Sequence, residues 1–360
     1  MKTVVVDKIA SITQALNLGH ELRIATTDLP CEEGVVLVVE ILTSKSTYNT
    51  LELTSGRMAK VSRGDIIVGA LGHRQALFGY SGHLPSSVKE GDIIQVLNIG
   101  GVLGIVDSAN PDKGKPFDCR VLGVVLQFPY LGERIGVPAK VGYRPLDYNI
   151  KVDTRKVPVV ALAGTCMEAG KTAAACAIVS RMRHRGLVVH AFKATGVSLR
   201  RDILAMEDAG ASRSMIFTDL GVVTTTAKTG PAITRALLTE MAQGEPDVIV
   251  FELGDGILGA YGVEAILASP DIKAALTSVV LSANDPVAAW GGVKLLRERF
   301  GIEPSVVTGP ATDNDVGVKI IREQMGVAAC NAITNGAALG DEVIAGLGLS
   351  PAQLARAVSE

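Results

Sequence analysis

The stretch AGTCMEAGKTAA at residues 163–174 constrains the fold of this chain more than any other part of the sequence. It ends in the Gly-Lys-Thr of a phosphate-binding loop, but five residues separate Gly164 from Gly170, where the usual pattern has four. An apolar run typical of a strand precedes the stretch and a helical pattern follows it, which is the context that such a loop requires. The sequence therefore predicts a phosphate-binding loop. An ordinary turn with a surface lysine is the alternative.

In a loop of this kind, backbone N–H groups and the start of the following helix face an anion. The predicted nucleotide-binding residues are Gly164, Thr165, Glu168, Ala169, Gly170, Lys171, Thr172 and Ala173. Lys171 would place a positive charge near the outer phosphates of ATP, and the hydroxyl group of Thr172 would ligate Mg²⁺.

The sequence after residue 150 alternates strand-like and helix-like segments. Five nearly continuous apolar runs are predicted as strands, at 158–164, 187–193, 247–253, 278–283 and 304–309. Such runs are typical of strands that are covered on both faces. Helices are expected between the strands, and a last helix is expected over residues 350–358. The pattern predicts an α/β domain over residues 151–360 with a doubly wound parallel sheet, whose ligands bind at the carboxyl ends of the strands.

Residues 1–150 predict a smaller β-rich domain, a barrel or a sandwich. Short apolar runs bounded by Gly, Asp, Pro and Ser dominate this part of the sequence, and no long segment has a helical period. Two segments are similar to each other, RGDIIVGALG from Arg63 and EGDIIQVLNIG from Glu90. A duplicated β-unit would explain the likeness, and chance recurrence of a common Gly-Asp turn is the alternative. The domain is expected to act as a lid, a substrate-recognition domain or an oligomerisation module.

Charged residues stand at the ends of two predicted strands. Glu252 ends one apolar run and Lys193 ends another, so both are expected at the ligand edge of the sheet. Glu252 has the place of a metal-binding acid, and capping of the next loop is the alternative. The candidate substrate-binding residues follow these strand ends: Thr195, Gly196, Arg200, Arg201, Gly254 and Asp255. For the two arginines a solvated charge cluster is the alternative.

The loop GTCMEAGKT resembles the long phosphate-binding loop of dethiobiotin synthetase and its relatives, which include cobyrinic acid a,c-diamide synthase. The resemblance extends to AFKA, where Lys193 matches a lysine that contacts substrate and phosphate, and to FELGDG, where Glu252 matches a metal-binding glutamate. It implies a Mg²⁺ site made by Thr172, Asp202 and Glu252. It also implies catalytic roles for Lys171, Lys193 and Glu252, with the lysines stabilising charge on the transferred phosphoryl group.

Several positions depart from that family. Its polar Asp-Thr pair inside the loop is Cys166-Met167 here, Ala194 replaces the proline after the lysine, and Leu253 replaces the glycine after the glutamate. These positions approach the substrate, so dethiobiotin synthesis itself is not expected. Thr165 stands where the dimeric Min- and Par-type ATPases have a second lysine, which argues against a membrane or DNA partitioning switch.

The composition is typical of a globular protein, and the cytoplasm is its expected location. A small-molecule substrate is expected from the motifs and the family resemblance. The net charge is −2 and no basic run occurs, so neither nucleic acid nor a membrane is expected as a partner. The first residues carry charges too early for a signal peptide. A homodimer or a higher homo-oligomer is expected.

Together, the motifs and the resemblance predict an ATP- and Mg²⁺-dependent ligase that activates a small carboxylate or carbamate by phosphoryl transfer. A small-molecule kinase is the near alternative, because the same parts would serve it. The alternative from another class is a nucleotide-dependent switch or metallochaperone NTPase that acts on a protein partner. Against a metallochaperone, the sequence has neither a Cys-x-x-Cys pair nor a histidine cluster.

Overall fold

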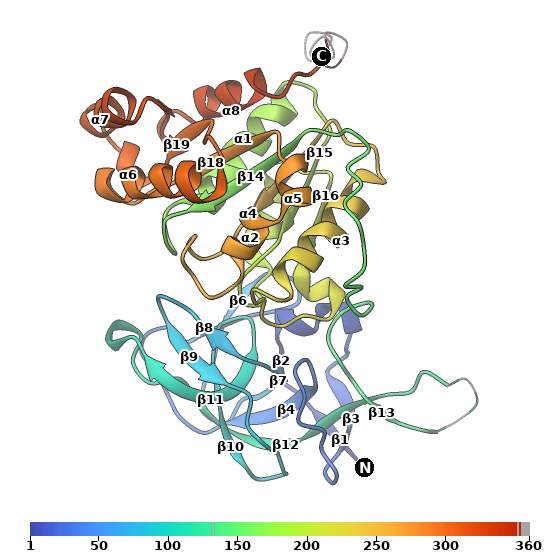
Figure 1. Ribbon diagram of the computed structural model, residues 1–360. Helices are drawn as coiled ribbons and strands as arrows, with labels where there is room; N and C mark the ends of the chain where they lie inside the picture. The colour runs from blue at the N-terminus through green and yellow to red at the C-terminus, as the bar shows by residue number, and fades with distance from the viewer. Residues whose placement is uncertain (131, 133, 351–352, 354–360) are drawn as a thin grey trace. The chain divides into compact units, whose positions relative to one another are not determined.

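The computed structural model describes residues 1–130, 132, 134–350 and 353 (Figure 1). The chain forms two compact units. Unit 1 comprises Met1–Leu146, Val197–Arg201 and Phe217–Thr224, and unit 2 comprises Asp147–Gly196, Asp202–Ile216 and Thr225–Glu360. Two short segments from the C-terminal part of the chain thus belong to unit 1, whereas the sequence predicted uninterrupted domains over 1–150 and 151–360.

Unit 1 is built around a closed β-barrel. Its strands are β4 (Val36–Ile41), β7 (Ile66–Leu71), β10 (Ile93–Val96), β11 (Val102–Ala109) and β12 (Asp118–Gln127). β12 pairs with β4, β4 with β7, β7 with β11, β11 with β10, and β10 again with β12, so the ring closes. Closure leaves these strands without a free edge. Of the predicted barrel or sandwich, the structure therefore has the barrel.

Shorter strands surround the barrel. The strands that extend its sheet are β1 (Lys2–Val5), β2 (Lys8–Ile9), β3 (Glu21–Ala25), β8 (Arg74–Gln75), β9 (Tyr80–His83) and β13 (Val137–Pro138). A separate hairpin pairs β5 (Thr50–Glu52) with β6 (Met58–Lys60).

The two similar sequence segments form equivalent turns. The glycines of turns 64–65 and 91–92 have φ of +89° and +92°. The first turn exchanges two backbone hydrogen bonds with Ile41, of 2.8 and 2.9 Å, and the second exchanges two of 2.9 Å with Val121. Left-handed φ at both positions explains why each turn carries glycine. The likeness in the sequence therefore extends to the geometry and hydrogen bonds of the two turns.

Unit 2 contains a seven-stranded sheet in which every neighbouring pair is parallel. In spatial order the strands are β16 (Arg213–Ile216), β15 (Val189–Lys193), β17 (Val248–Glu252), β14 (Val159–Gly164), β18 (Ser278–Ser282), β19 (Val306–Thr308) and β20 (Ala328–Ala329). The chain moves outward from β14 to β16 and then returns through β17. This arrangement is the predicted doubly wound α/β fold.

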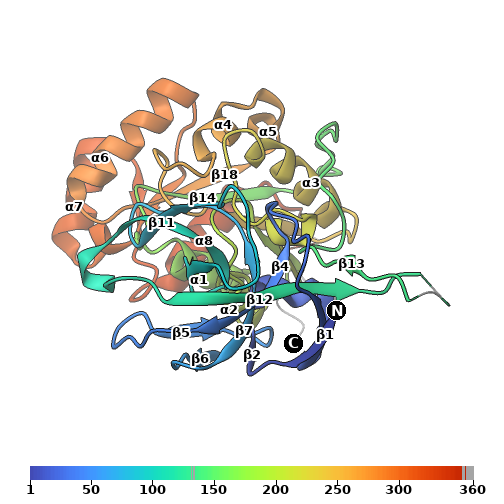
Figure 2. The same ribbon diagram turned by 90° about the horizontal axis from the view of Figure 1, so that it is seen from below.

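Helices cover both faces of this sheet, because each parallel crossover is right-handed and the direction of winding reverses after β16 (Figure 2). One face carries α1 (Lys171–His184), α2 (Arg201–Asp208) and α8 (Gly336–Ala345). The other carries α3 (Gly230–Ala242), α4 (Val263–Ala268), α5 (Pro270–Ala275), α6 (Pro286–Leu295) and α7 (Asp315–Met325). The helix expected over 350–358 falls largely outside the described residues. No helix in the described part of the chain is long and apolar enough to cross a membrane.

Candidate nucleotide-binding site

The predicted phosphate-binding loop joins β14 to α1. Glu168 and Gly170 in this loop have left-handed φ of +60° and +91°. The loop also packs closely on the residue that follows β19, since a Cβ atom on Gly309 would lie 2.3 Å from the carbonyl oxygen of Ala169. Gly309 has a φ of +89° as well, so both its conformation and this close approach require glycine.

Lys171 is folded back over its own loop. Its ammonium group donates a hydrogen bond of 2.8 Å to the carbonyl oxygen of Cys166, and the residue is 5% exposed. A Cβ atom on Gly164 would lie 2.8 Å from the Lys171 side chain, so the glycine leaves room for the lysine. Burial lowers the pKa of Lys171, and the carboxylate of Glu252 opposes that shift. A buried ammonium group of this kind is stabilised by an incoming anion.

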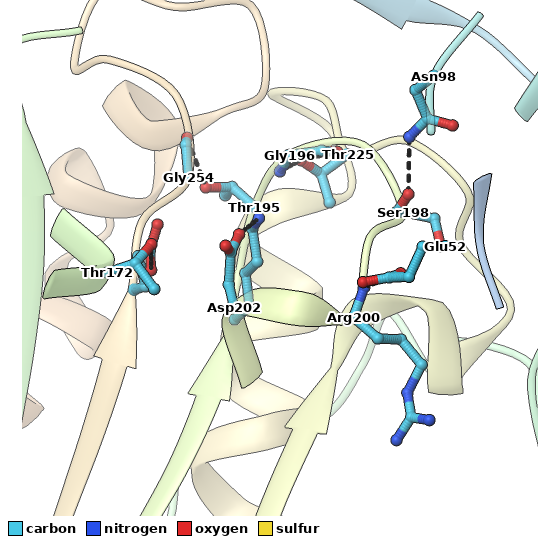
Figure 3. A network of polar contacts seen from close by, with 12 residues as sticks. Glu52, Asn98, Thr172, Thr195, Gly196, Ser198, Arg200, Asp202, Thr225 and Gly254 are labelled. Carbon is cyan, nitrogen blue, oxygen red and sulfur yellow. Dashed lines mark hydrogen bonds and ion pairs between the residues drawn. The ribbon is translucent and has the colours of Figure 1, made fainter. Parts of the chain in front are cut away.

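Thr172 contacts the acid at the end of the neighbouring β17 strand. Its hydroxyl group donates a hydrogen bond of 2.9 Å to Oε2 of Glu252 (Figure 3). Glu252 is 3% exposed, and burial raises its pKa. The negative charge of Asp202 raises the pKa further, while Lys193 and Lys171 lower it. A cation bound at this carboxylate would offset the cost of its burial.

A buried ion pair lies at the end of β15. Lys193, the last residue of that strand, pairs with Asp202 in the first turn of α2 (Figure 3). Lys193 is also the register partner of Glu252 in the neighbouring strand. The carboxyl ends of β14, β15 and β17 therefore bring two lysines and two carboxylates together.

The oxygen atoms of this cluster fit Mg²⁺. The Thr172 hydroxyl and the Glu252 carboxylate are in contact, and Asp202 is close enough to raise the pKa of Glu252. Mg²⁺ usually binds one or two carboxylates together with water and substrate phosphates. Among residues 1–130, 132, 134–350 and 353, no group of three or more His, Cys, Asp or Glu side chains is arranged to hold a metal. The Thr172 hydroxyl and the carboxylates of Glu252 and Asp202 are donors of the kinds that such a site uses.

Four of the predicted substrate-binding residues lie on the loops that follow β15 and β17. The hydroxyl group of Thr195 donates to the carbonyl oxygen of Gly254 at 3.1 Å, and the N–H of Gly196 donates to the Thr225 hydroxyl at 2.9 Å (Figure 3). Asp255 is buried and has a φ of +69°. These hydrogen bonds fix the loops at the ligand edge of the sheet. Contact with a substrate stays a prediction.

The two arginines of the predicted substrate site belong to unit 1. The guanidinium group of Arg200 donates to the carbonyl oxygen of Thr54 at 3.2 Å, and its backbone N–H donates to Glu52 at 2.8 Å. Arg201 begins α2 and is exposed. Arg200 is therefore engaged by residues 146 and 148 positions earlier in the chain, a pairing that local sequence patterns do not reveal.

Two hydroxyl residues at this edge were not predicted from the sequence. Ser282 and Thr308 end β18 and β19 and are fully buried. Their hydroxyl groups and that of Thr165 have no hydrogen-bond partner within the described residues. Ser282 is the register partner of both Gly164 and Thr308, so the three hydroxyl residues lie at adjacent strand ends. Polar residues that end the apolar runs SVVLS and VVT were the available signal.

No protein-family model matches the sequence, and no curated protein matches it. Among solved structures, the signal recognition particle receptor FtsY from Elizabethkingia anophelis is 15% identical with a TM-score of 0.38, over 53% of this chain and 66% of that one. A DUF1611 family protein from Anabaena variabilis is 14% identical with a TM-score of 0.39, over 56% and 63% of the two chains. The hydrogenase maturation factor HypB from Archaeoglobus fulgidus is 12% identical with a TM-score of 0.34, over 53% and 90%.

The match spans slightly less than two thirds of the first two of these proteins. Similarities this low do not decide the assignment, which rests on the geometry of the chain itself. A parallel sheet, a strand–loop–helix connection and a Lys-Thr pair at the start of the helix make unit 2 a P-loop nucleotide-binding fold.

Proposed function

We propose that unit 2 binds ATP with Mg²⁺ and transfers the terminal phosphoryl group to a small carboxylate or carbamate. The observation that carries the proposal is the gathering of two buried lysines, Lys171 and Lys193, with the carboxylates of Glu252 and Asp202. Phosphoryl transfer asks for little covalent chemistry from the protein and depends on positioning and charge stabilisation. The two lysines would stabilise the negative charge of the phosphoryl group, and the two carboxylates would position the metal ion.

The role of each side chain follows from its present contacts. The Thr172 hydroxyl and the Glu252 carboxylate would hold Mg²⁺, with Asp202 as the third ligand. Bound Mg²⁺ supplies positive charge that neutralises the outer phosphates. Lys171 would exchange the carbonyl oxygen of Cys166 for a phosphate oxygen.

The second lysine is what favours transfer to an anionic acceptor over simple nucleotide binding. Lys193 lies on a different strand from the phosphate-binding loop and is paired with Asp202. When Asp202 turns to the metal, the ammonium group of Lys193 can stabilise negative charge on the transferred group. The same charge attracts a small carboxylate, whose activation leads to a ligated product. A phosphorylated end product would instead mean a kinase.

A nucleotide-dependent switch is the second candidate, and one observation favours it. The segments that follow β15 and β16, residues 197–201 and 217–224, belong to unit 1. The chain therefore leads from the ends of two strands of the sheet into the other unit, and one of them, β15, ends at the proposed site. In a switch, the residues of the proposed site would hydrolyse ATP slowly. Hydrolysis would then change the conformation of unit 1 and so its affinity for a protein partner.

A mass-spectrometric assay of the purified full chain tests the proposal. ATP, Mg²⁺, bicarbonate and a pooled metabolite extract are incubated with the wild type and with Lys171→Ala and Lys193→Ala. Lys294→Ala, a change at an exposed lysine of α6, is the matched control. We expect the wild type and the control to consume one metabolite and release ADP, and the two site variants to do neither. Free phosphate with a condensed or carboxylated product identifies a ligase.

Two results would count against this function. ATP turnover without any change in a metabolite would favour the switch. A wild-type protein that binds no nucleotide in the presence of Mg²⁺ would exclude both candidates.

A further inference from the structure

The segment Val197–Arg201 links the proposed metal site to unit 1. Lys193 precedes it and Asp202 follows it, and both of these residues belong to unit 2, whereas the segment itself belongs to unit 1. Because Asp202 comes directly after the segment, the place where unit 1 holds these residues limits where the Asp202 carboxylate can lie.

Asn98 holds the first half of the segment. Its side-chain nitrogen donates a hydrogen bond of 2.7 Å to the carbonyl oxygen of Ser198 (Figure 3). Its side-chain oxygen accepts one of 2.9 Å from the N–H of Val102. Asn98 is 2% exposed and Ser198 is fully buried. A Cβ atom on Gly100 would lie 2.2 Å from the same carbonyl oxygen. The hydrogen bond from Asn98 and the close approach of Gly100 both act on the Ser198 carbonyl group, so this group is tied to unit 1 at two points.

Glu52 holds the second half. Its carboxylate accepts a hydrogen bond of 2.8 Å from the N–H of Arg200 (Figure 3). It accepts another from the hydroxyl group of Ser11. Glu52 is 0% exposed, and its second oxygen, Oε1, has no hydrogen-bond partner within the described residues. A buried carboxylate is costly unless N–H groups stabilise it. The buried carboxylate of Glu52 thus contacts the N–H of Arg200, which lies two residues before Asp202.

These contacts matter for the site because Asp202 lies in the first turn of α2, which begins at Arg201. Because Glu52 binds the N–H of Arg200, the residue before α2, the first turn of this helix cannot rotate freely about its axis. We propose that Asn98 and Glu52 are positioning residues, which hold residues 198–200 so that the Asp202 carboxylate lies where Mg²⁺ binds. This inference rests on the proposed function. Residues that orient metal ligands through hydrogen bonds typically contribute tenfold or more to metal affinity.

The experiment measures Mg²⁺ dependence separately from nucleotide affinity. The full-length protein is titrated with a fluorescent, non-hydrolysable ATP analogue, first in EDTA and then at increasing Mg²⁺. Asn98→Asp keeps the acceptor for Val102 but removes the donor to Ser198. We expect Asn98→Asp and Glu52→Ala to raise the Mg²⁺ concentration at half-saturation about tenfold, with analogue affinity in EDTA unchanged. Glu52→Gln keeps an acceptor for the Arg200 N–H and should stay near the wild type.

Gln95→Glu is the matched control for Asn98→Asp. It is also an amide-to-carboxylate change in unit 1, and it removes a donor to Asp118 that does not touch the segment. The inference is overturned if folded Asn98→Asp and Glu52→Ala keep the wild-type Mg²⁺ requirement. It is also overturned if they weaken analogue binding equally with and without Mg²⁺, since that pattern indicates a general structural role. A wild type that binds no analogue would instead remove the proposed function, and this inference with it.

Discussion

Lys171 and Lys193 make different contacts, so their removal should have different consequences. Lys171 belongs to the phosphate-binding loop, whereas Lys193 ends β15 and pairs with Asp202 of α2. We expect Lys171→Ala to weaken binding of an ATP analogue at least tenfold, because the phosphates lose a buried cation. Lys193→Ala should change that affinity by less than about threefold and lower turnover roughly 100-fold, because its charge acts on the transferred group. Calorimetry and ADP-release kinetics separate the two effects. A loss of affinity in Lys193→Ala together with a loss of turnover alone in Lys171→Ala would mean that Lys193 binds the phosphates and Lys171 acts on the transferred group.

A buried histidine outside the site gives a prediction about pH. His190 is 6% exposed, its Nδ1 lies 2.8 Å from the carbonyl oxygen of Met241, and burial lowers its pKa below the ordinary value of 6.5. The unfolded chain therefore takes up a proton at a higher pH than the folded chain. The contribution of neutral His190 to the free energy of unfolding is therefore fully present above the pKa of the unfolded state. It decreases as the pH falls toward the lower pKa of the folded state.

His190→Gln removes this titration while keeping an amide donor near Met241. We expect the stability advantage of the wild type over the variant to shrink between about pH 7.5 and about pH 5.5. Denaturant unfolding of both proteins at the two pH values measures the difference. A constant difference would show that His190 does not titrate in this range.

At the scale of the elements, the close approach between the phosphate-binding loop and the segment after β19 is open to a direct test. Gly309→Ala would place a Cβ atom 2.3 Å from the Ala169 carbonyl oxygen at a φ of +89°. Gly301→Ala is the matched control, since Gly301 has a φ of +63° but no atom within 4 Å of its Cβ position.

Gly301→Ala should lose about 1 kcal/mol of stability from its left-handed φ. Gly309→Ala should lose more, because a φ of +89° with a ψ of −169° is a conformation that almost only glycine adopts and because its Cβ atom clashes with the loop. We expect only Gly309→Ala to weaken binding of an ATP analogue as well, by about tenfold, because the loop must shift to relieve the clash. Thermal unfolding and analogue titration of both variants measure the two effects. Equal affinities would mean that the loop position does not depend on Gly309.

The sequence predicted the strands that are long and apolar, and it missed the short ones. β14, β15, β17, β18 and β19 lie within the five predicted runs. β16 contains Arg213 and Ser214 among its four residues, and β20 has only two residues, so neither has the apolar run on which the prediction depended. The strand ends at Lys193 and Glu252 followed from the same patterns. The hydrogen bond between the N–H of Arg200 and Glu52 could not be predicted, because a contact between residues 148 positions apart leaves no local signal in the sequence.

At the scale of the whole chain, the two units interleave in sequence. Residues 217–224 belong to unit 1 although they lie between strands of unit 2. Val223 is fully buried in the hydrophobic core of the barrel unit, and a Cβ atom on Gly72 would lie 2.5 Å from its side chain. The N–H groups of Val223 and Thr224 both lie within hydrogen-bond distance of Oε1 of Glu33, at 3.2 and 3.0 Å. The linker near residue 150 is therefore not a point at which one cut would separate two complete units.

This interleaving predicts the behaviour of a fragment. A chain of residues 151–360 would contain 197–201 and 217–224 without the unit 1 residues that bury and bond them. Exposure of Val223 alone would cost about 2 kcal/mol of burial free energy, and the lost hydrogen bonds to Glu33 would add to this. We expect the fragment to unfold at lower urea than unit 2 does in the full chain, with fluorescence of Trp290 on α6 reporting on both. A fragment with the midpoint of the full chain would show that unit 2 does not need these contacts, and that the boundary predicted from the sequence separates two independent domains.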